Sequence, residues 1–151
     1  MGKLYLRALH AAHLVRRPMT LGVRACAFDA QGRVFLVRHT YVSGWYLPGG
    51  GVEAGEPAEI CLARELAEEG RLEWPGAPRL LSVHLNNSAS RRDHVLFYRV
   101  DDVRQTSERT PDREIAECGF FDPAALPEGT TQATRRRLAE VLEGIAPDPF
   151  W

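Results

Sequence analysis

The sequence predicts a single α+β domain with a mixed β-sheet. Helical and strand patterns follow one another along the chain without a regular strand–helix–strand repeat, which favours an α+β fold or a mixed-sheet sandwich. The length of 151 residues is typical of one domain, since domains commonly hold about 100–200 residues. Apolar residues make up 44% and charged residues 26% of the chain, as in globular proteins. We therefore expect one folded domain over residues 1–151.

The first part of the chain contains one helical pattern and two strand patterns. Apolar residues at three-residue spacing predict a helix over residues 3–16, which ends before Pro18. Apolar runs predict strands over Val23–Phe28 and Arg33–His39, and the turn between them contains Asp and Gly. Because the connection is short, we expect these two strands to form a hairpin.

The second part begins with a loop and continues with two helices and three strands. Three consecutive glycines, Gly49–Gly51, indicate a loop. Residues Pro57–Gly70 give the strongest helical pattern, with proline at its start and glycine at its end. A last helix is predicted over residues 131–143. Further strands are predicted over three segments: Leu80–Leu85, Val95–Val100 and Ile115–Phe121.

Charge and cysteine content narrow the classes of function. The formal net charge of −1 does not favour a protein that binds stably to nucleic-acid phosphates. No run approaches the ~20 apolar residues that cross a bilayer, and the first segment lacks the small-residue cleavage site of a signal peptide. The three cysteines form no C-x-x-C pair, so neither a zinc knuckle nor a disulfide framework is indicated. We expect a cytoplasmic protein without a membrane partner.

The helix over Pro57–Gly70 carries three carboxylates on one face. The 3.6-residue repeat places Glu65, Glu68 and Glu69 together. Two of them lie in the last turn, where the helix dipole disfavours negative charge by roughly 0.3–1 kcal/mol each. A cation should compensate, and carboxylates without nearby His or Cys suit Mg²⁺ or Mn²⁺. The residues expected to pack against the sheet lie on the opposite side: Ile60, Ala63 and Ala67.

Each of these features also has a simpler explanation. A run of glutamates is commonly a solvated helix face, and a glycine cluster is commonly a turn. The combination is more informative, because Gly49–Gly51 permit close backbone approach just before the acidic helix. Carbonyl and carboxylate oxygens gathered in this way suit a metal-bridged phosphate.

The spacing of these residues resembles the box of the Nudix family of MutT-like hydrolases. The resemblance rests on Gly50, Glu56, the run Arg64–Glu69 and Leu72 at their set intervals, preceded by Trp45-Tyr-Leu-Pro-Gly-Gly. The sequence departs from the family pattern at Arg71, where the family has glycine. Gly70 stands one place earlier, and we expect it to adopt the left-handed conformation that ends the helix.

The resemblance implies an α/β/α sandwich and a metal-dependent hydrolase. Its substrate would be a nucleoside diphosphate linked to another moiety, such as a nucleoside triphosphate, an ADP-ribose-like compound or a nucleotide sugar. Metal ligands would be the Gly49 carbonyl and three carboxylates: Glu65, Glu68 and Glu69. Glu65 would also activate water. Arg64 and Glu56 would orient the ligating carboxylates.

Four residues outside the box are candidates for substrate binding. Trp45 adjoins the glycine loop and could stack on a base, although core packing also explains it. Arg92 and His94 could read a base or hold a phosphate, or they could belong to a solvated hairpin. Glu114 resembles an acidic residue that some Nudix proteins place near the metal, or it could face solvent from a strand. The sequence carries no motif that assigns one substrate.

Two further hypotheses remain open. The chain could be a nucleotide-binding or regulatory module that keeps the fold without turnover, with Arg71 as the supporting feature. The apolar residues of the first helix and Phe150–Trp151 could exceed what a small domain buries, so we also expect a homodimer.

Overall fold

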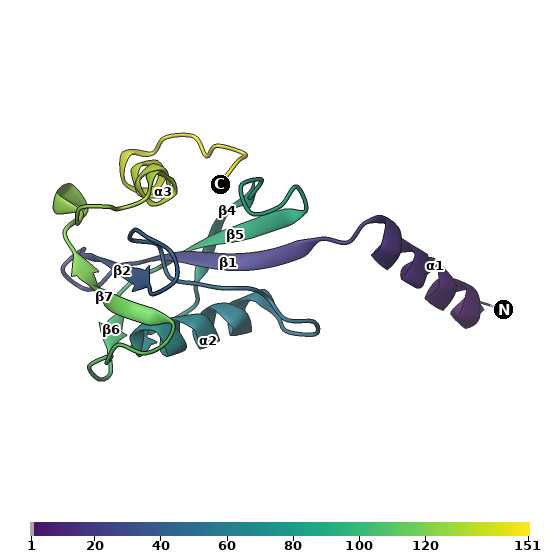
Figure 1. Cartoon of the computed structure of the whole chain (residues 1–151), viewed down its shortest axis with the longest axis horizontal. Helices are drawn as coiled ribbons and strands as arrows, with labels where there is room; N and C mark the ends of the chain where they lie inside the picture. The colour runs from purple at the N-terminus through teal and green to yellow at the C-terminus, as the bar shows by residue number, and fades with distance from the viewer. Residues whose placement is uncertain (1) are drawn as a thin grey trace.

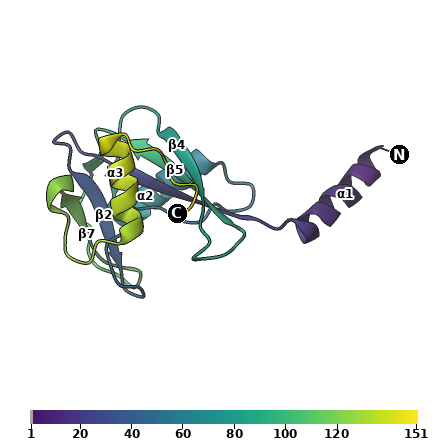
Figure 2. The same cartoon turned by 90° about the horizontal axis from the view of Figure 1, so that it is seen from above.

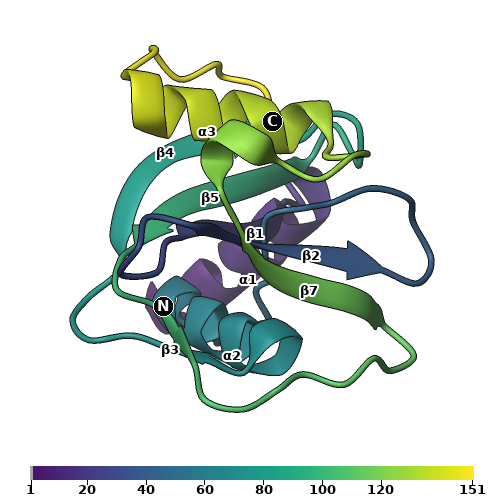
Figure 3. The ribbon, with the colours of Figure 1, turned by 90° about the vertical axis from the view of Figure 1, so that its left-hand side faces the viewer.

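The β-strands of the protein lie between two helices. In the computed structural model, which describes residues 2–151, helix α2 (Ala58–Gly70) covers one face of the strands and α3 (Gln132–Glu143) covers the other (Figure 1). The same layers are visible end-on in Figure 3. The α+β class and the placement of the strands between helices, both predicted from the sequence, are confirmed.

Two principal groups of strands form the central layer. In the first, β5 (Asp93–Val100) lies between β1 (Thr20–Ala27), to which it is parallel, and β4 (Arg79–Leu85), to which it is antiparallel. In the second, β2 (Val34–His39) pairs with β7 (Ile115–Phe121) in antiparallel orientation. The remaining short elements are β3 (Leu72–Glu73), β6 (Arg104–Gln105) and a 3₁₀ turn, Pro123–Ala125. The strand pairing is therefore mixed.

The hairpin predicted between the first two strands is wrong. A tight turn does join β1 to β2, and Asp29 Oδ1 accepts hydrogen bonds from the Gln31 and Arg33 amides. The strands themselves share only the bridge Phe28–Val34. They separate because β1 pairs along its whole length with β5 while β2 pairs with β7. Pairing with strands distant in sequence has outweighed the short connection.

The core has one cluster on each side of the central strands. Strand β1 directs Val23, Ala25 and Ala27 towards α2, and its intervening Cys26 packs on the other side with Leu138 of α3. This alternation follows from the two-residue period of a strand. Because both faces are covered, β1 and β2 are almost continuously apolar, as in strands buried on both sides.

Helix α2 is rotated relative to the sequence expectation. Its buried apolar residues are Cys61, Leu62 and Leu66. The residues expected to pack on the sheet are exposed instead: Ile60 (60%), Ala63 and Ala67. The buried face borders the carboxylates, so the acidic side of α2 faces the protein. An assignment that places the buried face of the helix directly opposite its glutamates therefore misses this rotation.

The ends of the chain have contrasting surroundings. The predicted helix over residues 3–16 is observed as α1 (Gly2–Arg16), which extends away from the strands (Figure 2). At the other end, Trp151 is partly buried and packs against the core, with its ring centroid 5.8 Å from that of Phe97. Within the described residues, no helix has the length and apolarity to span a membrane. The expected homodimer stays a prediction.

Candidate active site

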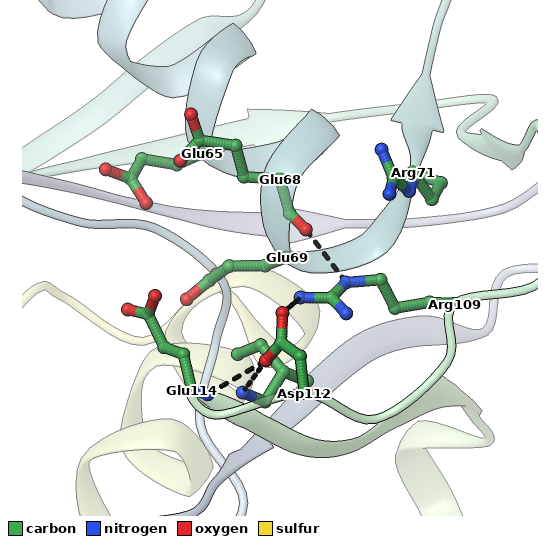
Figure 4. A pocket seen from close by; sticks show the side chains of 8 residues that line it. Glu65, Glu68, Glu69, Arg71, Arg109, Asp112 and Glu114 are labelled. Atoms are coloured by element: carbon green, nitrogen blue, oxygen red, sulfur yellow. Dashed lines mark hydrogen bonds and ion pairs between the residues drawn. The ribbon is translucent and has the colours of Figure 1, made fainter.

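A cavity of about 290 Å³ lies between the end of α2 and the loop that precedes β7 (Figure 4). Five carboxylates and two guanidinium groups line it together with one apolar residue: Glu65, Glu68, Glu69, Asp112, Glu114, Arg71, Arg109 and Ile115. The three glutamates of the predicted acidic helix face therefore all reach one cavity, and Glu114 joins them from a distant part of the sequence. We call it the acidic pocket.

Two glycines bring the loop against these carboxylates. Gly49 has φ +140°, and a Cβ there would lie 2.1 Å from the Val23 carbonyl oxygen, so no other residue fits. Its amide donates a 2.8 Å hydrogen bond to Glu69 Oε2. A Cβ on Gly50 would lie 2.4 Å from the Glu65 carboxylate. The close backbone approach predicted for the glycine loop is present, and it is directed at two of the three glutamates.

Arg64 holds the carboxylates of the box in place. Its Nε donates to Glu56 Oε1 at 2.9 Å and its Nη1 to Glu65 Oε1 at 2.7 Å. The same Nη1 lies 3.5 Å from Glu68 Oε2, one turn along the helix. The hydrogen bonds from Arg64 lower the pKa of Glu56 to about 2 and raise the pKa of Arg64 itself. Arg64 thus restrains Glu65 without entering the pocket lining.

Glu69 is the buried carboxylate of the site. It is 5% exposed, and Nε2 of His39 lies 3.8 Å from its Oε1. Burial raises the pKa of Glu69 to about 7, against the opposing effects of Arg24 and the Gly49 amide, and nearby Glu65 adds to the rise. A carboxyl in these surroundings is incompletely compensated by its neighbours, as expected where a cation belongs.

The wall opposite α2 comes from the segment before β7. Asp112 Oδ1 accepts hydrogen bonds from the amides of Glu114 and Ile115, each at 2.8 Å, and these bonds lower the pKa of Asp112 to about 2. Arg109 donates from Nη2 to Asp112 and from Nε to the Glu68 carbonyl. The segment is thereby attached to the last turn of α2.

A second cavity, of about 570 Å³, adjoins the glycine loop from the side of β1 and β5. Its lining includes Leu21 and Arg24 of β1, Gly50, and Asn86. Asp93 also lines it and accepts hydrogen bonds from Thr20 Oγ1 and Asn86 Nδ2 at 2.7 and 2.9 Å. Gly50 lines this cavity and abuts Glu65, which lines the acidic pocket, so the glycine loop lies next to both cavities.

The other predicted substrate contacts lie elsewhere. Trp45 is 7% exposed and packs on Phe121 with ring centroids 4.8 Å apart, so its proposed stacking on a base is corrected to core packing. Arg92 and His94 line neither cavity, whereas the alternating neighbours Asp93 and Val95 do. Within β5, the two-residue period directs His94 to the side opposite Asp93 and Val95, and Arg92 lies in the turn before the strand.

Several site residues were absent from the sequence analysis. Arg24 could have been noticed, because it is a charged residue within an otherwise apolar strand. Arg109 and Asp112 come from a polar segment without periodicity, so nothing in the sequence distinguishes them from solvated loop residues. His39 ends an apolar strand and gave no separate signal.

The end of α2 differs from the expectation. Arg71, not Gly70, adopts the left-handed conformation, with φ 55° and ψ 39°. Gly70 is the last helical residue, and a Cβ there would lie 2.5 Å from the Phe35 ring. Glycine is therefore needed at position 70 for packing, and Arg71 adopts the strained backbone.

The donor set fits a hard divalent cation. The pocket supplies carboxylate oxygens, which Mg²⁺ and Mn²⁺ prefer, and the buried Glu69 is incompletely compensated. Over the part of the chain that the structure describes, no three Asp, Glu, His or Cys side chains are already gathered as ligands of one ion. Binding would thus require side-chain rotation, which the exposed Glu68 can make.

Comparisons with known proteins agree with this geometry. The family model described as NUDIX domain matches residues 18–142. A MutT NUDIX hydrolase from Burkholderia pseudomallei superposes with a TM-score of 0.68 at 26% identity, covering 81% of this chain and 97% of that one. An ADP-ribose pyrophosphatase from Streptococcus suis gives a TM-score of 0.59 at 22% identity, covering 87% and 96% of the two chains, and this shows the fold alone.

A curated relative matches over a shorter length. An RNA pyrophosphohydrolase from Gluconobacter oxydans is 36% identical over 58 residues, which span 34% of each protein. The chain thus matches about a third of that relative's length. The family model covers most of the chain, including the acidic helix and both cavities. The chain belongs to the Nudix family.

Proposed function

We propose that this protein is a divalent-metal-dependent hydrolase that cleaves the pyrophosphate bond of a nucleoside diphosphate linked to another moiety. The observation that carries the proposal is the convergence of Glu65, Glu68, Glu69 and Glu114 on one cavity beside the glycine loop. Family membership supports pyrophosphate chemistry, and the matched relative and one structural neighbour are named as an RNA pyrophosphohydrolase and a MutT NUDIX hydrolase.

The box glutamates and the Gly49 carbonyl would hold Mg²⁺ or Mn²⁺. When bound, the ion would neutralise charge on the pyrophosphate oxygens and lower the pKa of water. Arg64 binds one oxygen of Glu65 and in turn is fixed by Glu56, so the ligating side chain keeps its orientation. Losing this support would misplace the carboxylates without removing them.

Glu65 is our candidate for the residue that takes a proton from the attacking water. Its Oε1 is occupied by Arg64, and its Oε2 accepts no hydrogen bond within the described residues. The free oxygen belongs to a residue that lines the acidic pocket. A carboxylate held on one side and open on the other can accept a proton at a fixed position.

The second cavity is our candidate for the nucleoside. Its volume of about 570 Å³ falls within the range of small-molecule sites, roughly 300–1,000 Å³. Leu21 and Val95 supply apolar surface, while Asn86 and Arg24 supply hydrogen-bonding groups. A nucleoside here would extend its phosphates past Gly50 towards the acidic pocket, because Gly50 lines the second cavity and abuts Glu65 of that pocket.

Product release across a substrate panel tests the proposal. The panel would hold nucleoside triphosphates, oxidised triphosphates, ADP-ribose and nucleotide sugars, each with Mg²⁺, Mn²⁺ or a chelator. We expect metal-dependent turnover of at least one substrate, lost in Glu65→Gln and Glu69→Gln. The control is Glu59→Gln, an exposed glutamate in the first turn of the same helix, which should retain turnover.

Two results would contradict the proposal. Turnover that is unchanged by the chelator and by both pocket variants would place the chemistry elsewhere. Tight nucleotide binding without turnover of any panel member would instead favour the alternative of a binding or regulatory module.

A further inference from the structure

Arg71 has a backbone conformation that arginine rarely adopts. It lies directly after α2 with φ 55°, in the left-handed region where glycine is favoured. Its amide donates to the Ala67 carbonyl, and its carbonyl accepts from Thr106, so the surrounding structure fixes the strained geometry. A large charged side chain in this position is unfavourable for the turn and calls for another explanation.

The side chain of Arg71 faces the acidic pocket and has no partner. Arg71 lines the pocket, and its guanidinium makes no hydrogen bond or ion pair within the part of the chain that is described. Arg109, the other guanidinium of the lining, is 9% exposed and already donates to Glu68, Thr110 and Asp112. Of the two cationic groups, Arg71 is the one available to a ligand.

The charges of the pocket are partly segregated, since the Asp112 carboxylate is paired with Arg109 while the other groups divide into two sides. Figure 4 shows the carboxylates of Glu65, Glu69 and Glu114 on one side and the guanidinium groups of Arg71 and Arg109 on the other. Arg71 follows Glu65 by six residues, which is about 9 Å along a helix axis. Glu65 abuts Gly50 and hence the second cavity, so Arg71 stands at the end of the pocket remote from that cavity.

We propose that Arg71 binds an anionic group on the substrate at the end remote from the nucleoside. The inference rests on the proposed function and narrows its substrate class. A substrate held by its nucleoside beside Gly50 and by its phosphates at the carboxylates places its far group near Arg71. A free guanidinium there favours a further phosphate, as in a nucleoside triphosphate, over a neutral sugar.

The test compares two substrates that share one base, a nucleoside triphosphate and a nucleoside diphosphate sugar. Wild type should prefer the triphosphate. In Arg71→Gly, we expect KM for the triphosphate to rise about 10- to 100-fold, the equivalent of one lost charge-assisted contact. In the same variant, KM for the nucleoside diphosphate sugar should change less than about 2-fold. Arg71→Lys should recover most of the loss, because it restores the positive charge.

A thermal unfolding measurement separates substrate binding from a structural role. Replacing Arg71 by glycine removes the left-handed strain, so Arg71→Gly should raise Tm by a few degrees while it weakens substrate binding. Asp102, which has the same φ of 55° outside the acidic pocket, gives the matched control. Asp102→Gly should also raise Tm and should leave KM unchanged.

The outcomes distinguish the two proposals. A wild type that hydrolyses substrates while Arg71→Gly retains its KM for the triphosphate would overturn the role of Arg71 alone. An equal loss on both substrates, or a wild type that prefers the sugar, would overturn the selection of an anionic group. A wild type that hydrolyses other members of the panel but neither of these two substrates would overturn the selection of a further phosphate and leave the proposed hydrolase function standing. Absence of turnover of every panel member would overturn both proposals.

Discussion

Two arginines of this protein contact glutamates on or next to their own helices, and their surroundings differ in burial. Arg64 on α2 contacts Glu56, Glu65 and Glu68, and about a third of its side chain is exposed beside the acidic pocket. Arg137 on α3 is completely buried, bonds Glu140 at 2.7 Å and contacts the His84 ring. The Arg64 cluster opens onto a cavity, whereas the Arg137 cluster is enclosed between α3 and the strands.

The difference shows how burial decides what an ion pair does. In the Arg137 cluster, Arg137 Nε and Glu140 Oε2 have no partner within the described residues, so the pair is incompletely compensated even when intact. Removing either partner would leave a charge inside the core. In the Arg64 cluster, solvent reaches the groups and weakens their contribution to stability. We infer that Arg137 contributes mainly to the stability of the fold, whereas Arg64 mainly orients the carboxylates of the acidic pocket.

The largest expected effect is on stability at Arg137. Replacing it by methionine leaves Glu140 buried without its partner, and we expect a loss of about 3–5 kcal/mol in the free energy of unfolding. Denaturant unfolding measures this loss. The double variant Arg137→Met with Glu140→Leu should recover much of it, because no charge is then left unpaired. A single variant as stable as wild type would contradict the assignment of Arg137 to the fold.

The next effect is on activity at Arg64. Arg64→Ala should lower turnover about 10- to 100-fold, the usual consequence of losing a residue that orients metal ligands. The free energy of unfolding of the Arg64→Ala variant should differ from that of wild type by less than about 1 kcal/mol, since the Arg64 cluster is partly solvated. Steady-state kinetics and denaturant unfolding on the same preparation check both values. A large loss of stability with unchanged turnover would reverse the comparison between the two arginines.

The smallest effect is a pH dependence of stability at Glu56. Its pKa is lowered to about 2 in the folded protein, so between about pH 2 and 4.5 the unfolded chain binds more protons there. The stabilisation by ionised Glu56 is therefore present above about pH 4.5 and is lost as pH falls towards 2. Glu56→Gln should be less stable than wild type at pH 7, with a difference that shrinks in acid. A difference independent of pH would show that the charge is unimportant.

The sequence predicted those parts of the fold and site that depend on local pattern. The spacing of the box gave the helix Ala58–Gly70 to within one residue and grouped three glutamates that do share a pocket. Strand Ile115–Phe121 was predicted with its observed bounds, which lie between the charged residues Arg113 and Glu114 and the pair Asp122-Pro123.

The failures concern long-range packing. Strand pairing partners distant in sequence replaced the expected hairpin, and the docking of Leu62 and Leu66 set the rotation of α2. Arg109 and Asp112 reach the pocket only through the path of a patternless loop. Trp45 lies close to the three glycines in sequence, but its ring packs in the core cluster that also contains Leu138 of α3.

The central claim is that the carboxylates of the acidic pocket bind a divalent cation, and Mn²⁺ binding tests it most directly. Titration followed by electron paramagnetic resonance would compare wild type with Glu65→Gln, Glu69→Gln and the control Glu59→Gln. We expect wild type and the control to bind Mn²⁺ alike, and each pocket variant to bind it at least about 10-fold more weakly. Equal Mn²⁺ affinity in all four proteins would contradict the assignment of the metal site to this pocket.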